Sequence, residues 1–184
     1  MTYMKTKEMI GKKILVIGSP GSGKSTFAKR LHEQSDIPLF HLDNLWWRPD
    51  RTHISRDEFD RLLGILLGQN AWILDGDYSR TLERRVAACD SVIFLDYPVE
   101  VCMEGITARI GQPRPDLPWT EQELDPELED MVRHYRETKR PAIYALKVAY
   151  PDRYWLILED RAQADEWLRT YKAVRAVADK LRMK

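Results

Sequence analysis

The glycine-rich segment at residues 18–25 is the part of the sequence whose residue types and spacing most clearly suit a chemical task. It reads Gly-Ser-Pro-Gly-Ser-Gly-Lys-Ser and fits the pattern G-x-x-x-x-G-K-[ST]. Several backbone N–H groups must converge on phosphate oxygens in such a loop, so it needs residues that tolerate unusual backbone angles. Lys24 can reach the outer phosphates, and the Ser25 hydroxyl can bind Mg²⁺. The segment predicts a site for a nucleoside triphosphate, ATP, with Mg²⁺.

The surroundings of this segment support the same interpretation. An apolar run at residues 14–17 predicts a buried strand before the loop, and a helical pattern follows it. A chance glycine-rich turn would not need the lysine, the serine and both flanking elements together. The residues that we expect to bind the nucleotide are Gly18, Ser19, Pro20, Gly21, Ser22, Gly23, Lys24, Ser25 and Thr26.

Aspartates follow three of the apolar runs that predict strands. Asp43 follows Leu-Phe-His-Leu, Asp75 follows Trp-Ile-Leu and Asp96 follows Ile-Phe-Leu. Ligands bind beyond the carboxyl ends of the strands in an open α/β sheet, where acids can orient hydrated Mg²⁺ or accept a nucleophile's proton. We prefer this interpretation for Asp43 and Asp75 over capping of the next helix. For Asp96 both interpretations stay open.

Aromatic residues lie close to Asp43 in the sequence. His41 is two residues away and would share its face in an extended segment, either as a general base or as a hydrogen-bonded structural histidine. Trp46 and Trp47 can stack on a planar substrate or cover a neighbouring helix, and both alternatives stay open.

A proline-rich stretch at residues 111–118 fits no regular element and predicts a surface loop, with a lid at about residues 110–120. Arg109 and Arg114 flank its start. A mobile loop that carries arginine can close over the transferring phosphate and exclude water. We therefore predict Arg109 and Arg114 as catalytic residues, together with Lys24 and Asp43.

Further arginines are clustered in two other places. One group follows Asp75, and the other lies at spacings of three and four residues, which would line one face of a helix. Such guanidinium groups can help to bind phosphate, but a solvated helix face explains them equally well. The two groups are Arg80, Arg84 and Arg85, and Arg133, Arg136 and Arg140.

The overall charge is balanced, with 29 Lys and Arg residues against 29 Asp and Glu residues. Binding to nucleic acid or to a membrane surface through charge alone needs a basic field or a basic face. We therefore expect small-molecule ligands; a nucleic-acid partner is disfavoured but not excluded, and no membrane partner is expected. The chain would be a monomer or a homodimer.

Short apolar runs alternate with amphipathic stretches, which is typical of a parallel α/β sheet. The expected strands lie at residues 14–17, 37–42, 71–74, 91–95 and 154–158. Ser55 and Glu58 form a capping box for one helix, and Asp125 with Pro126 starts a long helix that Pro141 should kink or break. The length of 184 residues predicts a single domain over residues 1–184.

The sequence predicts a cytoplasmic protein. No run approaches about 20 apolar residues, and residues 1–13 lack the apolar segment of a signal peptide. Cys89 and Cys102 show neither metal-ligand nor redox spacing, so we expect two reduced thiols near the core.

Five segments together resemble a known family: GSPGSGKST, HLDNLWW, ILDGDYSR, FLDYP and RPDLPW. They are similar to the adenylate-kinase-related P-loop proteins labelled "DNA topology modulation protein", over about residues 12–145. That family is similar to nucleoside monophosphate kinases and to shikimate and gluconate kinases. The resemblance implies a P-loop NTPase fold of the nucleotide-kinase type, with a five-stranded parallel sheet in the order 2-3-1-4-5, flanking helices, an acceptor region and a short lid.

The resemblance also implies roles for particular residues. Asp75 and Gly76 match the Asp-Gly pair that closes the third strand near the acceptor in nucleotide kinases, and Tyr78 and Arg80 belong to the same segment. Arg80 lies one position later than the adenylate-kinase arginine. Arg109 matches a lid-proximal arginine, whereas Gly105 stands where a further arginine is usual.

These observations lead to one expected function and two alternatives. We expect an ATP-dependent kinase, similar to nucleoside monophosphate kinases, that transfers the γ-phosphate to a small acceptor. The first alternative is an ATP-binding or ATP-hydrolysing regulator associated with DNA topology. The second is a kinase of a non-nucleotide hydroxylated metabolite.

Overall fold

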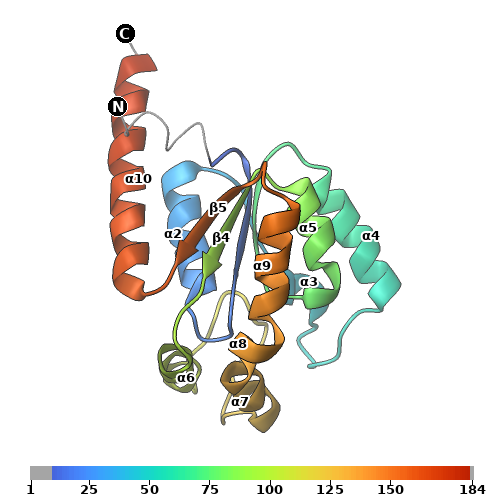
Figure 1. Ribbon diagram of the computed structural model, residues 1–184. Coiled ribbons are helices and arrows are strands. Elements are labelled where there is room, and N and C mark those ends of the chain that lie inside the picture. Colours follow the sequence, from blue (N-terminus) through green and yellow to red (C-terminus); the bar gives the residue numbers. More distant parts are fainter. Residues whose placement is uncertain (1–9, 183–184) are drawn as a thin grey trace.

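The computed structural model describes residues 10–182, and its sheet follows the predicted order (Figure 1). All neighbouring strands pair in parallel in the order β2-β3-β1-β4-β5. The strands are β1 (Lys13–Gly18), β2 (Leu39–His41), β3 (Trp72–Asp75), β4 (Ser91–Leu95) and β5 (Tyr154–Leu158). Each lies on one of the five predicted apolar runs, and β4 and β5 have the predicted bounds.

Helices connect the strands and cover both faces of the sheet (Figure 1). They are α2 (Lys24–Ser35), α3 (Leu42–Trp46), α4 (Arg56–Leu67), the 3₁₀ turn η1 (Ser79–Thr81), α5 (Leu82–Ala88), α6 (Val99–Ala108), α7 (Pro126–Arg133), α8 (Tyr135–Thr138), α9 (Arg140–Ala149) and α10 (Arg161–Arg182).

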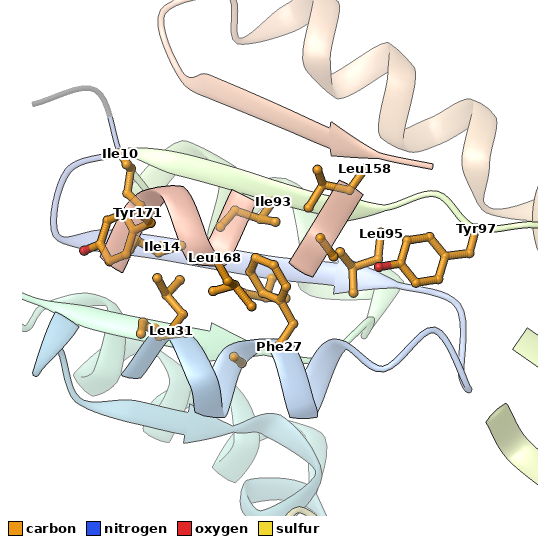
Figure 2. Packing of buried hydrophobic residues seen from close by; sticks show 14 of the residues in the cluster. Ile10, Ile14, Phe27, Leu31, Ile93, Leu95, Tyr97, Leu158, Leu168 and Tyr171 are labelled. Atoms are coloured by element: carbon orange, nitrogen blue, oxygen red, sulfur yellow. The ribbon is translucent and has the colours of Figure 1, made fainter. Parts of the chain in front are cut away.

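Alternation along the strands builds a core on each side of the sheet. Ile14 of β1 packs on the side of α2 and α10, among Phe27, Leu31 and Leu168 (Figure 2). The next residue, Leu15, faces the other way and joins the core formed with α4, α5 and α9. A continuous apolar run therefore becomes a strand that is covered on both faces, as expected for a parallel sheet.

Two predicted helix starts are confirmed. The Ser55 hydroxyl accepts a hydrogen bond of 3.2 Å from the backbone N–H of Glu58 at the start of α4. Asp125 accepts one of 2.9 Å from the backbone N–H of Glu127, and Pro126 opens α7. These side chains satisfy backbone donors that the first helical turn leaves unpaired.

The predicted long helix after Asp125 is divided into three. The helix is interrupted at Lys139, two residues before Pro141, which is the interruption that the proline predicts. It also breaks at His134, where the sequence holds no proline or glycine. The three arginines predicted on one helix face therefore belong to α7, α8 and α9, and that shared face does not exist.

Two smaller expectations concern the cysteines and the membrane. Cys89 and Cys102 are both free and buried, as predicted. None of the helices within residues 10–182 combines the length and the apolarity that crossing a bilayer requires. Most of residues 1–13, on which the signal-peptide argument rests, lies outside the described residues.

Helix α6 packs directly against the glycine-rich loop, backbone against backbone. A Cβ atom at Gly105 would overlap the carbonyl oxygen of Gly21, and one at Gly21 would overlap the carbonyl oxygen of Cys102. Gly21 also has a φ of 79°, which favours glycine. Gly105, interpreted from the resemblance as the place of a missing arginine, is therefore a packing position that leaves no room for a side chain.

Gly105→Ala should lower the free energy of unfolding by about 1–3 kcal/mol, because the added methyl group forces α6 away from the loop. Gly68→Ala is the matched control: its Cβ would meet only carbonyl oxygens at 3.5 Å, an ordinary contact. Urea denaturation followed by circular dichroism measures both variants. Equal stability of the two would contradict the close approach.

Candidate active site

The glycine-rich loop joins β1 to α2 and has the features of an anion cradle. Gly23 precedes α2 with a φ of 83°, so the first backbone N–H groups of the helix face the loop. The Ser22 hydroxyl is buried without a hydrogen-bond partner among the described residues. Lys24 likewise makes no hydrogen bond or ion pair with any residue in the described range. These unpaired donors suit a bound polyanion.

The loop borders a cavity of about 570 Å³. One wall holds residues 21–26 of the loop and the start of α2. Cationic side chains from α2, the 109–125 loop and α10 line other parts of it, together with apolar residues and the acids Asp116 and Asp165. The cationic side chains are Lys29, Arg30, Arg109, Arg114 and Arg161.

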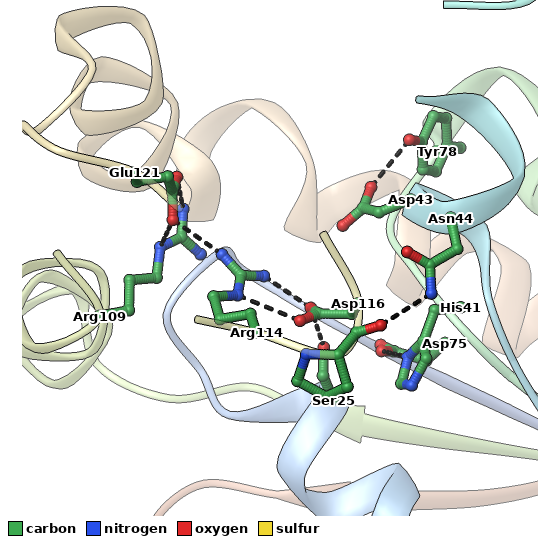
Figure 3. Close-up of polar contacts among 11 residues, drawn as sticks. Ser25, His41, Asp43, Asn44, Asp75, Tyr78, Arg109, Arg114, Asp116 and Glu121 are labelled. Atoms are coloured by element: carbon green, nitrogen blue, oxygen red, sulfur yellow. Dashed lines mark hydrogen bonds and ion pairs between the residues drawn. The ribbon is translucent and has the colours of Figure 1, made fainter. Parts of the chain in front are cut away.

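Residues 109–125 form an irregular segment that a chain of ion pairs ties to the glycine-rich loop (Figure 3). Arg109 donates to Glu121, with an Nε–Oε2 distance of 2.8 Å. Arg114 donates to the same Oε2 oxygen at 2.9 Å and to Oδ2 of Asp116 at 2.6 Å. Ser25 then donates its hydroxyl hydrogen to Asp116, with an Oγ–Oδ2 distance of 2.7 Å.

Asp116 is the residue through which this chain of ion pairs reaches the predicted nucleotide site. Its side chain is 3% exposed. Burial alone would raise the pKa of Asp116, but the hydrogen bonds and charge of Arg114 and the Ser25 hydroxyl lower it to about 2. Asp116 is therefore a carboxylate at any ordinary pH.

On the other side of Lys24, helix α3 presents Asp43. The Tyr78 hydroxyl donates a hydrogen bond of 2.8 Å to Oδ1 of Asp43 (Figure 3). Burial, together with the charges of Asp75 and Asp116, raises the pKa of Asp43, and Lys24 and Tyr78 offset part of that rise. Oδ2 of Asp43 makes no hydrogen bond with any described residue. A half-buried carboxylate with one unpaired oxygen can accept a proton from a hydroxyl group.

His41 and Asp75 pair across the ends of β2 and β3, with an Nδ1–Oδ2 distance of 2.9 Å. Burial alone would lower the pKa of His41, but the hydrogen bond and charge of Asp75, with the charges of Asp116 and Asp43, raise it. Oδ1 of Asp75 is buried without a partner among the described residues. His41 thus makes the hydrogen bond expected of a structural histidine and also lies among the acids of the site.

Asp77, which had no predicted role, and Arg85 are further features of this region; Arg85 was expected either to bind phosphate or to lie on a solvated helix face, and its burial excludes the solvated face. Burial raises the pKa of Asp77 to about 6, although Lys24, the Tyr135 hydroxyl and Arg85 lower it. The Tyr135 hydroxyl donates to Asp77 at 3.0 Å. Arg85 is fully buried and donates to the backbone carbonyls of Gly76 and Tyr78 at 2.7 and 2.6 Å. Arg85 thus holds the Gly76–Tyr78 segment in place.

The arginines expected on the acceptor side are engaged elsewhere. Arg80 forms a two-pronged ion pair with Asp60 of α4, at 2.6 and 2.8 Å, in an exposed position. Arg84 donates to the carbonyl of the same residue. The structure thus brings Asp43, Asp75 and Tyr78 together but gives Arg80 a different partner.

The arginines of α7 and α9 also have structural partners. Arg133 pairs with Glu129 within α7. Arg140 donates from Nε to both carboxylate oxygens of Asp96, at 2.9 and 2.8 Å, which ties the end of β4 to α9. The carboxylate of Asp96 therefore caps none of the described helices and is bound by Arg140 and Tyr144 of α9. Arg136 of α8 makes no hydrogen bond or ion pair with any residue between 10 and 182.

Both tryptophans of the HLDNLWW segment are used in packing. The Trp46 ring stacks on the His53 ring, with centroids 4.4 Å apart, and meets the Phe59 ring of α4 edge-on. Trp46 therefore covers a neighbouring helix, which is one of the two predicted alternatives. Trp47 meets Trp119 of the 109–125 loop at 5.3 Å. Asn44 adds a hydrogen bond of 2.8 Å to the carbonyl of Pro115, so α3 and this loop are in contact.

Asp77→Asn should stabilise the protein at neutral pH. Because folding raises the pKa of Asp77 from 3.8 to about 6, ionisation opposes folding as the pH rises through that interval. The asparagine keeps an oxygen for Tyr135 but carries no charge. We expect a gain of about 2 kcal/mol in the free energy of unfolding near pH 7 that disappears by about pH 4. Urea denaturation across this range measures it, and a destabilised variant at neutral pH would contradict the assignment.

The chain matches no family model, and no curated protein matches its sequence. Its fold, however, matches solved kinases. A gluconokinase from Sinorhizobium meliloti 1021 shares 17% identity at a TM-score of 0.55, over 95% of this chain and 97% of the gluconokinase. A shikimate kinase from Acinetobacter baumannii, solved in complex with shikimate, shares 16% identity at a TM-score of 0.59, over 95% and 97%.

A shikimate kinase from Bacteroides thetaiotaomicron has a TM-score of 0.55 at 17% identity, over 90% of this chain and 97% of the kinase. All three likenesses extend over nearly the whole of each chain. The fold of this protein is therefore that of the P-loop kinases of the nucleotide-kinase type.

Proposed function

We propose that this chain is an ATP-dependent phosphotransferase that uses Mg²⁺ and a small acceptor. One observation carries the proposal: an anion cradle with a free lysine lies near a half-buried acid on the acceptor side, beside a loop that carries two arginines. The three structural neighbours, named as kinases, add support. Lys24, Asp43, Arg109 and Arg114 are the proposed catalytic residues.

The residues of the cradle fit ATP and Mg²⁺. The Ser22 hydroxyl and Lys24 lack partners among the described residues and suit phosphate oxygens, while Ser25 supplies an oxygen suited to the metal. Bound Mg²⁺ would stabilise negative charge on the phosphoryl oxygens. Lys24 would share that task at the transferring group, and Arg109 and Arg114 line the same cavity from the 109–125 loop.

Asp43 is the proposed proton acceptor. Its unpaired Oδ2 can accept a hydrogen bond from an acceptor hydroxyl, and its raised pKa makes it a better base than an exposed aspartate. Tyr78 orients the carboxylate through Oδ1. Asp75, Gly76 and Tyr78 complete the proposed acceptor wall, which Arg85 fixes from behind.

The arginines indicate what kind of acceptor suits this wall. A nucleoside monophosphate brings its own phosphate, which usually needs guanidinium partners. Arg80 and Arg84 are bound to Asp60, and Arg85 is buried on backbone carbonyls. The side chains of the proposed acceptor wall include the carboxylates of Asp43 and Asp75, which are good acceptors for hydroxyl groups. A neutral hydroxylated metabolite is therefore our first candidate, and a nucleoside monophosphate, with Arg80 moved from Asp60, is the second.

We also expect residues 1–184 to form a single domain and the 109–125 segment to act as the lid predicted at about residues 110–120. The protein works in the cytoplasm as a monomer or a homodimer. A regulator of DNA topology is the least supported alternative, because the zero net charge supplies no general attraction for nucleic acid.

An acceptor screen tests this proposal. Release of ADP from Mg·ATP is measured with nucleoside monophosphates, with sugars and polyols, and with hydroxy acids. We expect a hydroxylated compound without phosphate to raise the rate at least about tenfold over the rate with water alone. In Lys24→Ala that rate should fall about 10²–10³-fold with an unchanged melting temperature, because the variant loses a charge that stabilises the transferring phosphate.

Two results would count against the proposal. If Lys24→Ala keeps the wild-type rate, the cradle is not the site of the reaction. If only nucleoside monophosphates raise the rate, the arginine argument is wrong and the second candidate replaces the first.

A further inference from the structure

The contact between Ser25 and Asp116 joins two segments that lie 91 residues apart in the sequence. Ser25 is the hydroxyl of the phosphate loop that suits Mg²⁺. Asp116 comes from the middle of the 109–125 loop, and its side chain is almost completely buried. A carboxylate so close to a triphosphate site is unexpected, because bare carboxylate and phosphate oxygens repel each other.

We propose that Asp116 is a metal-binding residue: the 109–125 loop carries its carboxylate to the Ser25 hydroxyl so that both oxygens hold the Mg²⁺ of the bound nucleotide. This inference rests on the proposed function, since it concerns the metal that accompanies ATP. The 109–125 loop would then not only cover the site but also supply one of the metal ligands.

The spacing of the two oxygens fits such a pair. Mg²⁺ binds six oxygens octahedrally at about 2.1 Å, so two adjacent ligands lie about 2.9 Å apart. The Ser25 Oγ and Asp116 Oδ2 atoms are 2.7 Å apart. A small outward movement of the two oxygens therefore admits the metal, with the Ser25 hydrogen turned away from Asp116. One carboxylate, one hydroxyl, phosphate oxygens and waters make an ordinary Mg²⁺ site.

Charge supports the same assignment. Asp116 lines the cavity that also contains Lys24 and the glycine-rich loop. Arg114 already compensates Asp116 from one side, and a divalent ion between the carboxylate and the triphosphate would be attracted to both. Arg114 holds both oxygens of Asp116, at 3.1 and 2.6 Å, and so fixes the direction of the carboxylate.

Asp75 provides a second, independent observation. It follows Leu74, which faces the α5 side, so its side chain lies on the face that α2 covers. Its Oδ1 atom is buried and has no partner among the described residues. An unpaired buried carboxylate oxygen near the start of α2 suits a water molecule bound to the metal.

The main alternative is a latch. In that case Asp116 occupies the Ser25 hydroxyl only while no metal is present and must leave when Mg·ATP binds. The two roles predict opposite effects of removing the carboxylate: loss of a ligand weakens metal-dependent binding, whereas loss of a latch strengthens it.

Calorimetric titration with a non-hydrolysable ATP analogue separates these roles. The affinity is measured in Mg²⁺ and again in EDTA, and their ratio is the metal enhancement. We expect Asp116→Asn to reduce this enhancement about tenfold or more, with no loss of affinity in EDTA. Binding of Mn²⁺ to the complex, followed by electron paramagnetic resonance, should weaken by a similar factor.

Glu121→Gln is the matched control, because it also removes one negative charge from a partner of Arg114 but does not contact Ser25. Its metal enhancement should stay within about threefold of the wild type, since the charge that changes lies on the far side of Arg109 and Arg114 from Ser25. Asp116→Glu keeps the charge and can still pair with Arg114, and we expect it to recover the enhancement only in part. This second variant also serves if Asp116→Asn does not fold.

Three outcomes would overturn the inference. An unchanged enhancement in Asp116→Asn, or full recovery in Asp116→Glu, would make Asp116 only a partner of Arg114. An increased enhancement in Asp116→Asn would establish the latch. If the wild type binds no nucleotide in either medium, the proposed function itself fails, which is a different result from a wild type that binds and a variant that does not change.

Discussion

The rest of this structure depends on how it stabilises a group of aspartate side chains that are partly or fully removed from water. Asp43, Asp75, Asp77 and Asp116 all lie around the carboxyl ends of β2 and β3 and the start of α2. Each has a dedicated partner. Tyr78, His41, Tyr135 and Arg114 contact them in that order. A carboxylate buried without such a partner would destabilise the fold by several kcal/mol, so the partners are as much a part of the site as the acids.

The partners differ in kind, and the difference separates the acids into two groups. Arg114 lowers the pKa of Asp116 to about 2, so this acid stays charged and suits a metal ion. Tyrosines hold Asp43 and Asp77, and the pKa of each is raised. A raised pKa suits the proposed role of Asp43 as a proton acceptor for a hydroxyl group. The arrangement also lowers the stability of the protein, because two raised pKa values oppose folding near neutral pH.

Much of the fold was predictable because it depends on local pattern. Apolar runs marked the strands, and Ser55 and Asp125 marked helix starts through hydrogen bonds within one turn. The sheet order came from the resemblance to P-loop kinases and is confirmed. The second break, at His134, was not predictable, since the sequence there holds no proline or glycine.

The candidate site was predictable in part. The glycine-rich loop and the aspartates at two strand ends lie together as expected, because parallel strands end at one edge. Arg80 and Arg140 did not follow, because their partners, Asp60 and Asp96, come from other segments, whereas Arg109 and Arg114 line the cavity. Asp116 had no assigned role, although its place two residues after Arg114 was a visible signal. The reason for a glycine at position 105 became visible only in the structure, because it is the close contact between α6 and Gly21.

The fate of the γ-phosphate tests the central claim most directly. Phosphorus NMR of the protein with Mg·ATP and a hydroxylated acceptor follows every phosphorus atom at once. The account predicts a new phosphomonoester signal that grows in equal amount with ADP, while inorganic phosphate stays near its background, because the proposed lid would exclude water. Conversion of the γ-phosphate to inorganic phosphate alone would contradict it and would make the protein an ATP hydrolase.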